Sequence, residues 1–385
     1  MKAPLGVLLL TFLSSCSALS LGPALRDDAV NYHQAVEDTA NNILVTNILR
    51  ARDRAPLHFS DLAIVRGSLQ ENASVQATFP FGPLHGTNAR NSLQVGGVSL
   101  QNAPGFDLST LDTQEFTKGI LSPIDPLFIK YFLDQGTDPR VILLLFFAGL
   151  KTGDGLVLRN DPDELDQFFQ YVRFVNEEHN GLYVNAYYEL RSIGAPFSLN
   201  MHDSFKEVAG LDMTKVRIKK EPDGKYRLYT ISPDQKAAFC RYLGQDPTGR
   251  ARYKLLQISK GIARSGDEAC SNAEVVVDPA ETKKDELFIR SPAAIIEYLG
   301  SLLRLQQTIG RGITLDPGRQ YALFELTEAS EHPRFTIEYR GRWYSVDEAS
   351  ERDHTLAVLA LVTQLLNSYK SAKDIPSTRS VVVTP

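Results

Sequence analysis

The spacing of apolar residues along the chain alternates between helical and strand periods. From Asp27 to Arg54 apolar residues recur every three or four positions, as on one face of a helix, until Pro56. The next stretch, LHFSDLAIVRGSLQENASVQATF, changes to a strand-like pattern on both sides of an ENAS turn. We therefore expect a long first helix followed by a hairpin or small sheet.

Start signals for helices are clear in the middle of the chain. Asp112 with Glu115 resembles a capping box, and Asp125 and Asp138 each precede a proline. The run VILLLFFAGL from Val141 is almost wholly apolar but is too short to cross a bilayer, which needs about 20 residues. It predicts a helix buried on all sides, at the centre of the core.

Two later segments also have helical spacing, and both predict amphipathic helices: DELDQFFQYVRFV and YVNAYYELRSI. On the first, one face collects the apolar residues Leu165, Phe168, Phe169 and Val172. Residues 232–235 (SPDQ) predict another helix, with a capping box and a proline in its first turn, ending at Gly244. Further helices are expected from Ser291-Pro292 and over residues 353–371.

Turn residues mark two hairpins in the second half. The stretch VRIKKEPDGKYRLYTIS has strand-like runs on both sides of the tripeptide at residues 222–224, which favours a turn. FTIEYRGRWYSV predicts a hairpin with a two-residue loop at residues 340–341, so that Ile337 faces Tyr344. Helices first and hairpins interleaved later indicate an α+β fold, a helix-rich body with interleaved β-hairpins.

The amino terminus has the three regions of a secretory signal peptide. Lys2 precedes the nine-residue apolar stretch LGVLLLTFL, and small residues follow it. Because this stretch is too short to stay in the bilayer as a spanning helix, we expect its removal.

The sequence LSSC at residues 13–16 resembles the lipobox of bacterial lipoproteins, in which a Leu and two small residues precede a Cys. The resemblance implies that the Cys16 sulfur carries diacylglycerol and that cleavage just before Cys16 frees an amino group for acylation by a chain such as palmitate. Two or three acyl chains anchor a protein stably, whereas one does so marginally. The position after the cysteine holds Ser17 and not an Asp. By the same resemblance, this favours the outer membrane. The alternative is cleavage after Ala18 or Ser20, which would discard Cys16.

Length and composition allow one large domain or two. The 385 residues are 43% apolar and 23% charged, which is typical of globular proteins. We expect a signal peptide at 1–15, a lipidated tether at 16–26, a helix-rich region with a small hairpin at 27–200 and an α+β region at 201–385. The last two regions form either separate domains or one continuous domain.

Whether Cys16 is lipidated or lost, Cys240 and Cys270 are left as a possible pair. In an oxidising compartment they can form a disulfide, which would stabilise by about 3–4 kcal/mol through closure of a loop of roughly 30 residues. Two isolated buried thiols are the alternative. We expect no metal site, because neither a CxxC motif nor paired histidines accompany them.

The charge balance argues against a nucleic-acid partner. The formal net charge is −5, so phosphate backbones would be attracted only by a local basic patch. Two basic runs are candidates, the arginines at positions 50, 52 and 54 and the stretch VRIKKEPDGKYR, and both are more typical of a solvated face.

Motifs of nucleotide, metal and hydrolase chemistry are absent from the sequence. It contains no GxxxxGK[ST], HExxH or GxSxG, so we expect no cofactor and assign no catalytic residue. The acid-base clusters worth testing are His202-Asp203 and His179 beside its two glutamates, because a general base needs an orienting carboxylate. Surface polar residues are the alternative for both.

Two other groups of residues are candidates for binding. Arg290, Ser291 and Pro292 could hold an anion at the amino end of a helix; alternatively Ser291 caps that helix and Arg290 pairs with Glu286 or Glu297. The hairpin around Trp343 combines aromatic and cationic side chains, which are enriched at protein interfaces; packing in the core would explain the inward-facing half equally well. The other aromatic and cationic residues of this hairpin are Tyr339, Arg340, Arg342 and Tyr344.

Four blocks, spread from Asn47 to Ser368, resemble in order the recurring blocks of a family of uncharacterised Gram-negative bacterial lipoproteins: NILRARDRAPLHFSDLAIVRGSL, DTQEFTKGILSPIDPLFIKYFLDQG, LFIRSPAAIIEYLG and IEYRGRWYSVDEASERDHTLAVLALVTQLLNS. This resemblance implies a lipoprotein and carries no activity with it.

The sequence as a whole predicts a protein anchored by Cys16 to the periplasmic face of the outer membrane. We expect a structural or assembly component without catalysis, with the membrane and an envelope protein as its partners. The alternative is a membrane-tethered hydrolase of cell-envelope polymers, in which His179 or His202 would meet a carboxylate and a hydroxyl. A third reading, capture of a small ligand, would require a pocket lined by apolar groups.

Overall fold

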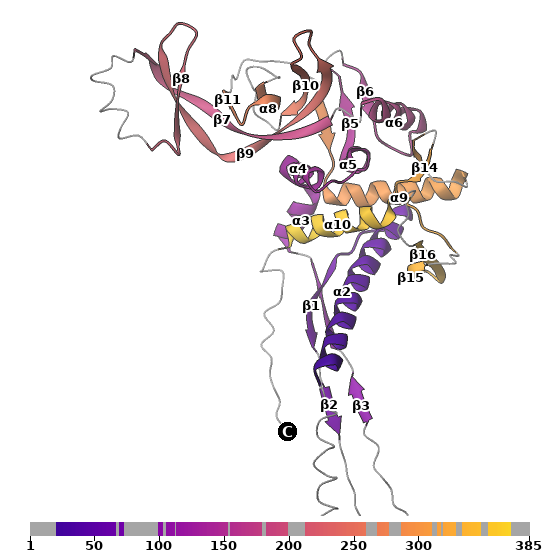
Figure 1. Ribbon diagram of the computed structural model, residues 1–385. Coiled ribbons are helices and arrows are strands. Elements are labelled where there is room, and N and C mark those ends of the chain that lie inside the picture. The colour runs from indigo at the N-terminus through magenta and orange to yellow at the C-terminus, as the bar shows by residue number, and fades with distance from the viewer. Residues whose placement is uncertain are drawn as a thin grey trace, which may run out of the picture. The chain divides into compact units, whose positions relative to one another are not determined.

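The computed structural model describes most of the chain, and Figure 1 labels its helices and strands. The described residues are 21–66, 69–72, 99–102, 105–111, 113–152, 155–178, 182–198, 212–258, 268–276, 286–309, 314–316, 319–328, 333–347 and 353–370.

Helices and mostly antiparallel sheets share the described chain, which confirms the α+β class. The helices are α2 (Leu21–Arg52), α3 (Gln114–Leu121), α4 (Pro126–Asp134), α5 (Pro139–Phe146), α6 (Leu165–Glu178), α8 (Glu268–Ser271), α9 (Pro292–Ile309) and α10 (Thr355–Tyr369). The strands are β1 (Ser60–Arg66), β2 (Leu69–Asn72), β3 (Ser99–Asn102), β4 (Gly105–Thr110), β5 (Phe147–Lys151), β6 (Val157–Arg159), β7 (Leu182–Phe197), β8 (Val216–Lys220), β9 (Tyr226–Gln245), β10 (Ala251–Ile258), β11 (Glu274–Val276), β12 (Glu286–Ile289), β13 (Thr314–Asp316), β14 (Arg319–Ala322), β15 (Pro333–Tyr339) and β16 (Arg342–Asp347).

Contacts between residues divide the chain into two compact units. The first unit consists of Met1–Val36, His58–Asp112 and Ser371–Pro385, and the second of Glu37–Leu57 and Thr113–Lys370. In the first unit, the described strands pair antiparallel as β1 with β4 and as β2 with β3. The VQATF segment of the predicted hairpin lies outside the described residues.

The first helix of the described residues, α2, begins at Leu21 rather than at Asp27, so it includes part of the expected tether. It ends in a Schellman motif: Arg54 takes a positive φ of 55°, and the amide of Ala55 donates to the carbonyl of Arg50 at 2.8 Å. Its second half buries one apolar face in the second unit, formed by Leu44, Val45, Ile48 and Leu49.

Side-chain caps fix the start of three short helices. Asp125 Oδ1 accepts from the amide of Leu127 at 2.9 Å and Asp138 Oδ1 accepts from that of Arg140 at 2.8 Å, as the sequence predicted. The predicted cap at Asp112 is wrong, because α3 is capped by Thr113, the residue directly before its first turn.

The apolar run from Val141 lies at the centre of the core, but only its first half is helical. All residues of α5 from Val141 to Phe146 are buried, and the chain then becomes strand β5, which pairs with β12 on one side and β6 on the other. The prediction of one continuous helix is therefore wrong beyond Phe146. Within β5 a glycine is required at position 149, because its φ of +155° disfavours other residues and a Cβ there would lie 2.3 Å from the Leu158 carbonyl oxygen of β6.

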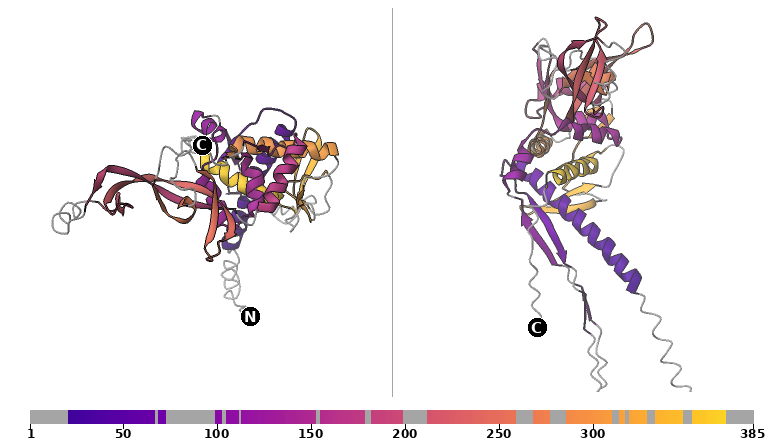
Figure 2. Two further views of the ribbon diagram at one scale, coloured as in Figure 1. Left: turned by 90° about the horizontal axis from the view of Figure 1, so that it is seen from above. Right: turned by 90° about the vertical axis from the view of Figure 1, so that its left-hand side faces the viewer.

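The large sheet of the second unit has the order β10-β9-β7-β11, and β8 also pairs with β9. Two segments predicted as helices, YVNAYYELRSI and the residues from Ser232 to Gly244, are strands β7 and β9. The long antiparallel ladder between β7 and β9 decides both segments, and in β9 it outweighs the local capping signal at residues 232–235. Beyond the rest of the sheet, β7 and β9 form with β8 an arm that extends away from α9 and α10 (Figure 2).

The structure brings Cys240 and Cys270 to disulfide distance, with their sulfurs 2.10 Å and their Cα atoms 5.6 Å apart. Cys240 belongs to strand β9 rather than to the expected helix, and Cys270 lies in the short helix α8. Asn185 on β7 donates to the carbonyl of Ala269 at 2.8 Å, so α8 is also tied to the sheet by a side chain.

The remaining helices and the second predicted hairpin follow the sequence pattern closely. Strands β15 and β16 pair in the predicted register, with Ile337 opposite Tyr344. Helices α9 and α10 lie near each other and near α3 in the second unit (Figure 1).

Helix α6 buries Phe168, but Phe169 is 53% exposed, so its predicted burial is wrong. Phe169 lies next to the buried face rather than on it, because neighbouring residues of a helix point about 100° apart.

Close packing between α9 and α2 predicts that Gly300→Ala destabilises the protein. A Cβ at Gly300 would lie 2.5 Å from the backbone nitrogen of Arg52 and 2.7 Å from the Cβ of Ala51. The helices would have to separate, so we expect a loss of about 1–3 kcal/mol in the free energy of unfolding, measured with urea. Gln307→Ala, at an exposed position of α9, is the control and should change it by less than about 0.5 kcal/mol. Equal stability of the Gly300→Ala variant and the wild type would refute this packing.

Candidate functional site

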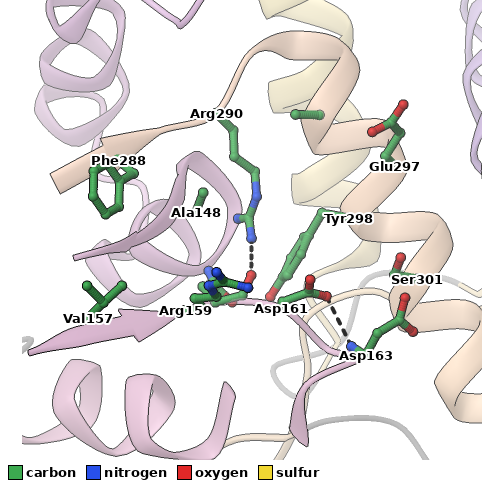
Figure 3. A pocket seen from close by; sticks show the side chains of 12 residues that line it. Ala148, Val157, Arg159, Asp161, Asp163, Phe288, Arg290, Glu297, Tyr298 and Ser301 are labelled. Atoms are coloured by element: carbon green, nitrogen blue, oxygen red, sulfur yellow. Dashed lines mark hydrogen bonds between the residues drawn. The ribbon is translucent and has the colours of Figure 1, made fainter. Parts of the chain in front are cut away.

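A pocket of about 560 Å³ lies in the second unit beside the sheet β12-β5-β6 and the start of α9 (Figure 3). Arg290, which the sequence singled out, lines it together with Asn160 and Tyr298. The chain holds Arg290 by its backbone: its amide donates to the carbonyl of Phe146 at 2.8 Å, and its carbonyl accepts from the amide of Ile124 at 3.1 Å.

The Arg290 side chain covers the carboxyl end of α5. The last four carbonyls of a helix have no partner inside it, and α5 is too deeply buried for water to supply one. Nη1 of Arg290 donates to the carbonyl of Leu144 at 2.8 Å and to that of Leu145 at 3.2 Å. Nη2 donates to the carbonyl of Asn160. The positive charge also lies at the negative end of the helix dipole, where it stabilises most.

Two further side chains complete this cap. Nδ2 of Asn160 donates to the carbonyl of Leu144 at 2.7 Å and to that of Phe147 at 2.8 Å. The hydroxyl of Tyr171 donates to the carbonyl of Leu143 at 3.1 Å. Since the Arg290 amide bonds to Phe146, each of the last four carbonyls of α5 has a donor.

Burial governs the titration of this cluster. The guanidinium carbon of Arg290 lies 3.8 Å from the centre of the Tyr298 ring, and the residue is only 6% exposed. Loss of hydration lowers the pKa of Arg290, an effect that nearby Tyr298, Tyr171 and Asp161 oppose. The same loss of hydration raises the pKa of Tyr171 and of Tyr298 above the usual value for tyrosine.

The two parts of the predicted anion site do not converge. Ser291 Oγ accepts from the amide of Ala294 at 3.2 Å and so caps α9, which was the alternative to an anion site. The other half of that alternative is wrong, because Arg290 bonds to carbonyl oxygens of the α5 cap instead of Glu286 or Glu297. Sequence patterns cannot reveal this partnership, since the backbone carbonyls that Arg290 contacts carry no residue signature.

The hairpin β15–β16 is attached to the end of α2. Arg52 donates to the Tyr344 hydroxyl at 2.9 Å, and its guanidinium carbon lies 5.2 Å from the centre of the Tyr344 ring. Asp53 bonds to Arg52 at 2.8 Å and to Arg340 at 3.0 Å. Burial alone would lower the pKa of Arg52, but the hydrogen bonds to Asp53 and Tyr344 outweigh it and raise that pKa. Trp343, on the opposite face, is 57% exposed.

Both predicted basic runs contain arginines that the rest of the protein engages. Arg52 is buried under the hairpin. In the second run, Arg217 pairs with Glu274 at 2.7 Å and Arg227 with Glu221 at 3.3 Å.

Other candidate residues lie outside the described part of the chain, namely Cys16, His179, His202 and Asp203. Within the described part, no group of three or more His, Cys, Asp or Glu side chains could hold a metal ion. No helix of that part has the length and apolarity needed to cross a bilayer.

Comparison of the chain with known family models, with curated proteins and with solved structures finds no match.

Removal of the Arg290 guanidinium should destabilise the fold much more than removal of its exposed neighbour. Arg290→Met leaves the carbonyl of Leu145 without its donor, so we expect a loss of about 2–4 kcal/mol in the free energy of unfolding. Arg159, which also lines the pocket, has a 59% exposed side chain and pairs with Glu164 at the surface. Arg159→Met should therefore cost at most about 1 kcal/mol. Urea denaturation of both variants checks this, and equal losses would contradict the role of Arg290 as a helix cap.

Proposed function

We propose that this protein is a lipid-anchored envelope protein of the outer membrane, on its periplasmic face, and that it serves as a structural or assembly component. The observation that carries the proposal is the short apolar signal that ends in LSSC at Cys16. Helix α2 of the described chain begins at Leu21, so four residues lie between the lipid-bearing cysteine and this position. Even fully extended, these four residues span only roughly 14 Å, so the start of α2 would stay close to the bilayer.

The hairpin β15–β16 supports the assembly part of the proposal. Its inward face packs on Arg52 through Tyr344, which holds the strands in place. Trp343 is thereby presented to solvent on a rigid support, with Arg342 as its exposed neighbour on the same strand. Tryptophan and arginine are the residues that most often dominate the binding energy of protein interfaces. This surface is the one on which we expect an envelope partner.

Lipidation is tested by Cys16→Ala in cells supplied with a labelled fatty acid. We expect the wild type to incorporate the label and to sediment with outer membranes, and the variant to do neither, because only the Cys16 thiol carries the anchor. A double variant, Cys240→Ala with Cys270→Ala, is the matched control and should retain the label. Mass analysis showing a mature protein that begins after Ala18 or Ser20, with no acyl groups, would refute the anchor.

The partner surface is tested by a photo-cross-linking phenylalanine analogue placed at Trp343 in intact cells. We expect a discrete adduct with an envelope protein, because an exposed interface aromatic contacts its partner directly. The same analogue at Leu121, an exposed apolar residue on α3, is the control and should give no such adduct. Absence of any adduct at Trp343, or identical adducts at both positions, would count against this surface.

A further inference from the structure

The pocket beside α9 contains polar groups whose bonding capacity the fold does not use. A guanidinium has five N–H groups, and Arg290, which lines the pocket, forms three bonds to carbonyls, so two of its N–H groups have no partner among the described residues. The hydroxyl of Tyr298 makes no hydrogen bond of normal geometry to a described residue, although Asn160 lies near enough to lower its pKa. Tyr298 is only 5% exposed, so an unused donor there is costly.

The far wall of the pocket is acidic. Asp161 and Glu297 line it, and within the described chain neither forms an ion pair, because the nearby cations are engaged elsewhere. Arg159 pairs with Glu164 at 3.0 Å. Asp163, the third acid of the wall, pairs with Arg304 at 2.6 Å.

The other side of the pocket is apolar. Phe288 on β12 and Val157 on β6 are 38% and 42% exposed, although both are large apolar side chains. Figure 3 shows them on one side of Arg290, with Tyr298, Glu297 and Asp161 on the other. Gly149 pairs with Phe288 on one side and Arg159 on the other, so the middle strand has no side chain between them. Exposed apolar groups beside a few convergent polar groups are typical of small-molecule sites.

We propose that this pocket binds a small zwitterion with an apolar side chain, either a free α-amino acid or a short peptide with free ends. Its carboxylate would accept from Arg290 and Tyr298, its ammonium group would lie against Asp161 and Glu297, and its side chain would cover Phe288. A ligand with only negative charge would be repelled by the two acids, and one with only positive charge by Arg290. The volume of about 560 Å³ is in the usual range for such ligands. The inference does not depend on the lipid anchor.

Isothermal titration of the detergent-purified full chain with the dipeptide leucyl-leucine tests this ligand class. Two blocked dipeptides are titrated in parallel: the N-acetyl form, which has no ammonium group, and the C-terminal amide, which has no carboxylate. We expect each block to weaken binding by about tenfold or more, as loss of a charged hydrogen bond does. Absence of heat with leucyl-leucine at millimolar concentrations would overturn the proposal. Equal affinity of all three peptides would overturn it as well, because it would indicate an apolar groove only.

Variants that keep the α5 cap locate the site. Tyr298→Phe removes only the unused hydroxyl, and Glu297→Gln removes one exposed charge, so both should fold, as their thermal unfolding can verify. Each variant should bind leucyl-leucine about tenfold more weakly than the wild type does. In the Glu297→Gln variant, the difference in affinity between leucyl-leucine and its N-acetyl form should also be smaller. Glu338→Gln, an exposed glutamate on β15 outside the pocket, is the control and should bind as the wild type does. Unchanged affinity in both pocket variants would refute this location.

Discussion

The carboxyl end of α5 imposes the constraint on which the second unit depends. Helix α5, which is buried from Val141 to Phe146, ends with four carbonyls that water cannot reach, and each unpaired one would cost free energy of the order of a lost hydrogen bond. Three residues far apart in the sequence supply the donors: Tyr171, Asn160 and Arg290. Their bonds hold α6, the segment after β6 and the start of α9 around one point. A short apolar helix therefore organises elements from more than a hundred residues of chain.

The pocket lies beside this point. Arg290 directly follows strand β12 and its amide bonds to the carbonyl of Phe146, so the sheet β12-β5-β6 and the start of α9 meet at the pocket. The guanidinium of Arg290 is bonded to carbonyl oxygens rather than to a carboxylate, and of the three acids of the pocket wall only Asp163 forms an ion pair within the described chain. The hairpin β15–β16 is held by comparable chemistry, because Arg52 at the end of α2 is bonded to Asp53 and stacked on Tyr344. In both places a buried arginine joins a helix end to a distant segment.

Local signals in the sequence were reliable where the interaction itself is local. Asp125 and Asp138 cap their helices because the capping bond spans two residues, and the register of β15 and β16 follows from their two-residue loop. Strand β9 was mistaken for a helix because residues 232–235 have the local pattern of a helix start, and its consecutive residues from Ala237 to Cys240 are all buried. A strand covered on both faces loses its two-residue alternation, so its pattern cannot be told from that of a buried helix.

The sequence by itself determined the α+β class and the starts of α4, α5 and α9, because propensity and capping act over a few residues. It also singled out Arg290, though with the wrong partners. Only the tertiary structure decided what Arg290 binds and that Trp343 faces solvent while Tyr344 is buried. The physical reason is that backbone carbonyls are identical at every residue, so which of them needs a distant donor depends on where the folded chain excludes water.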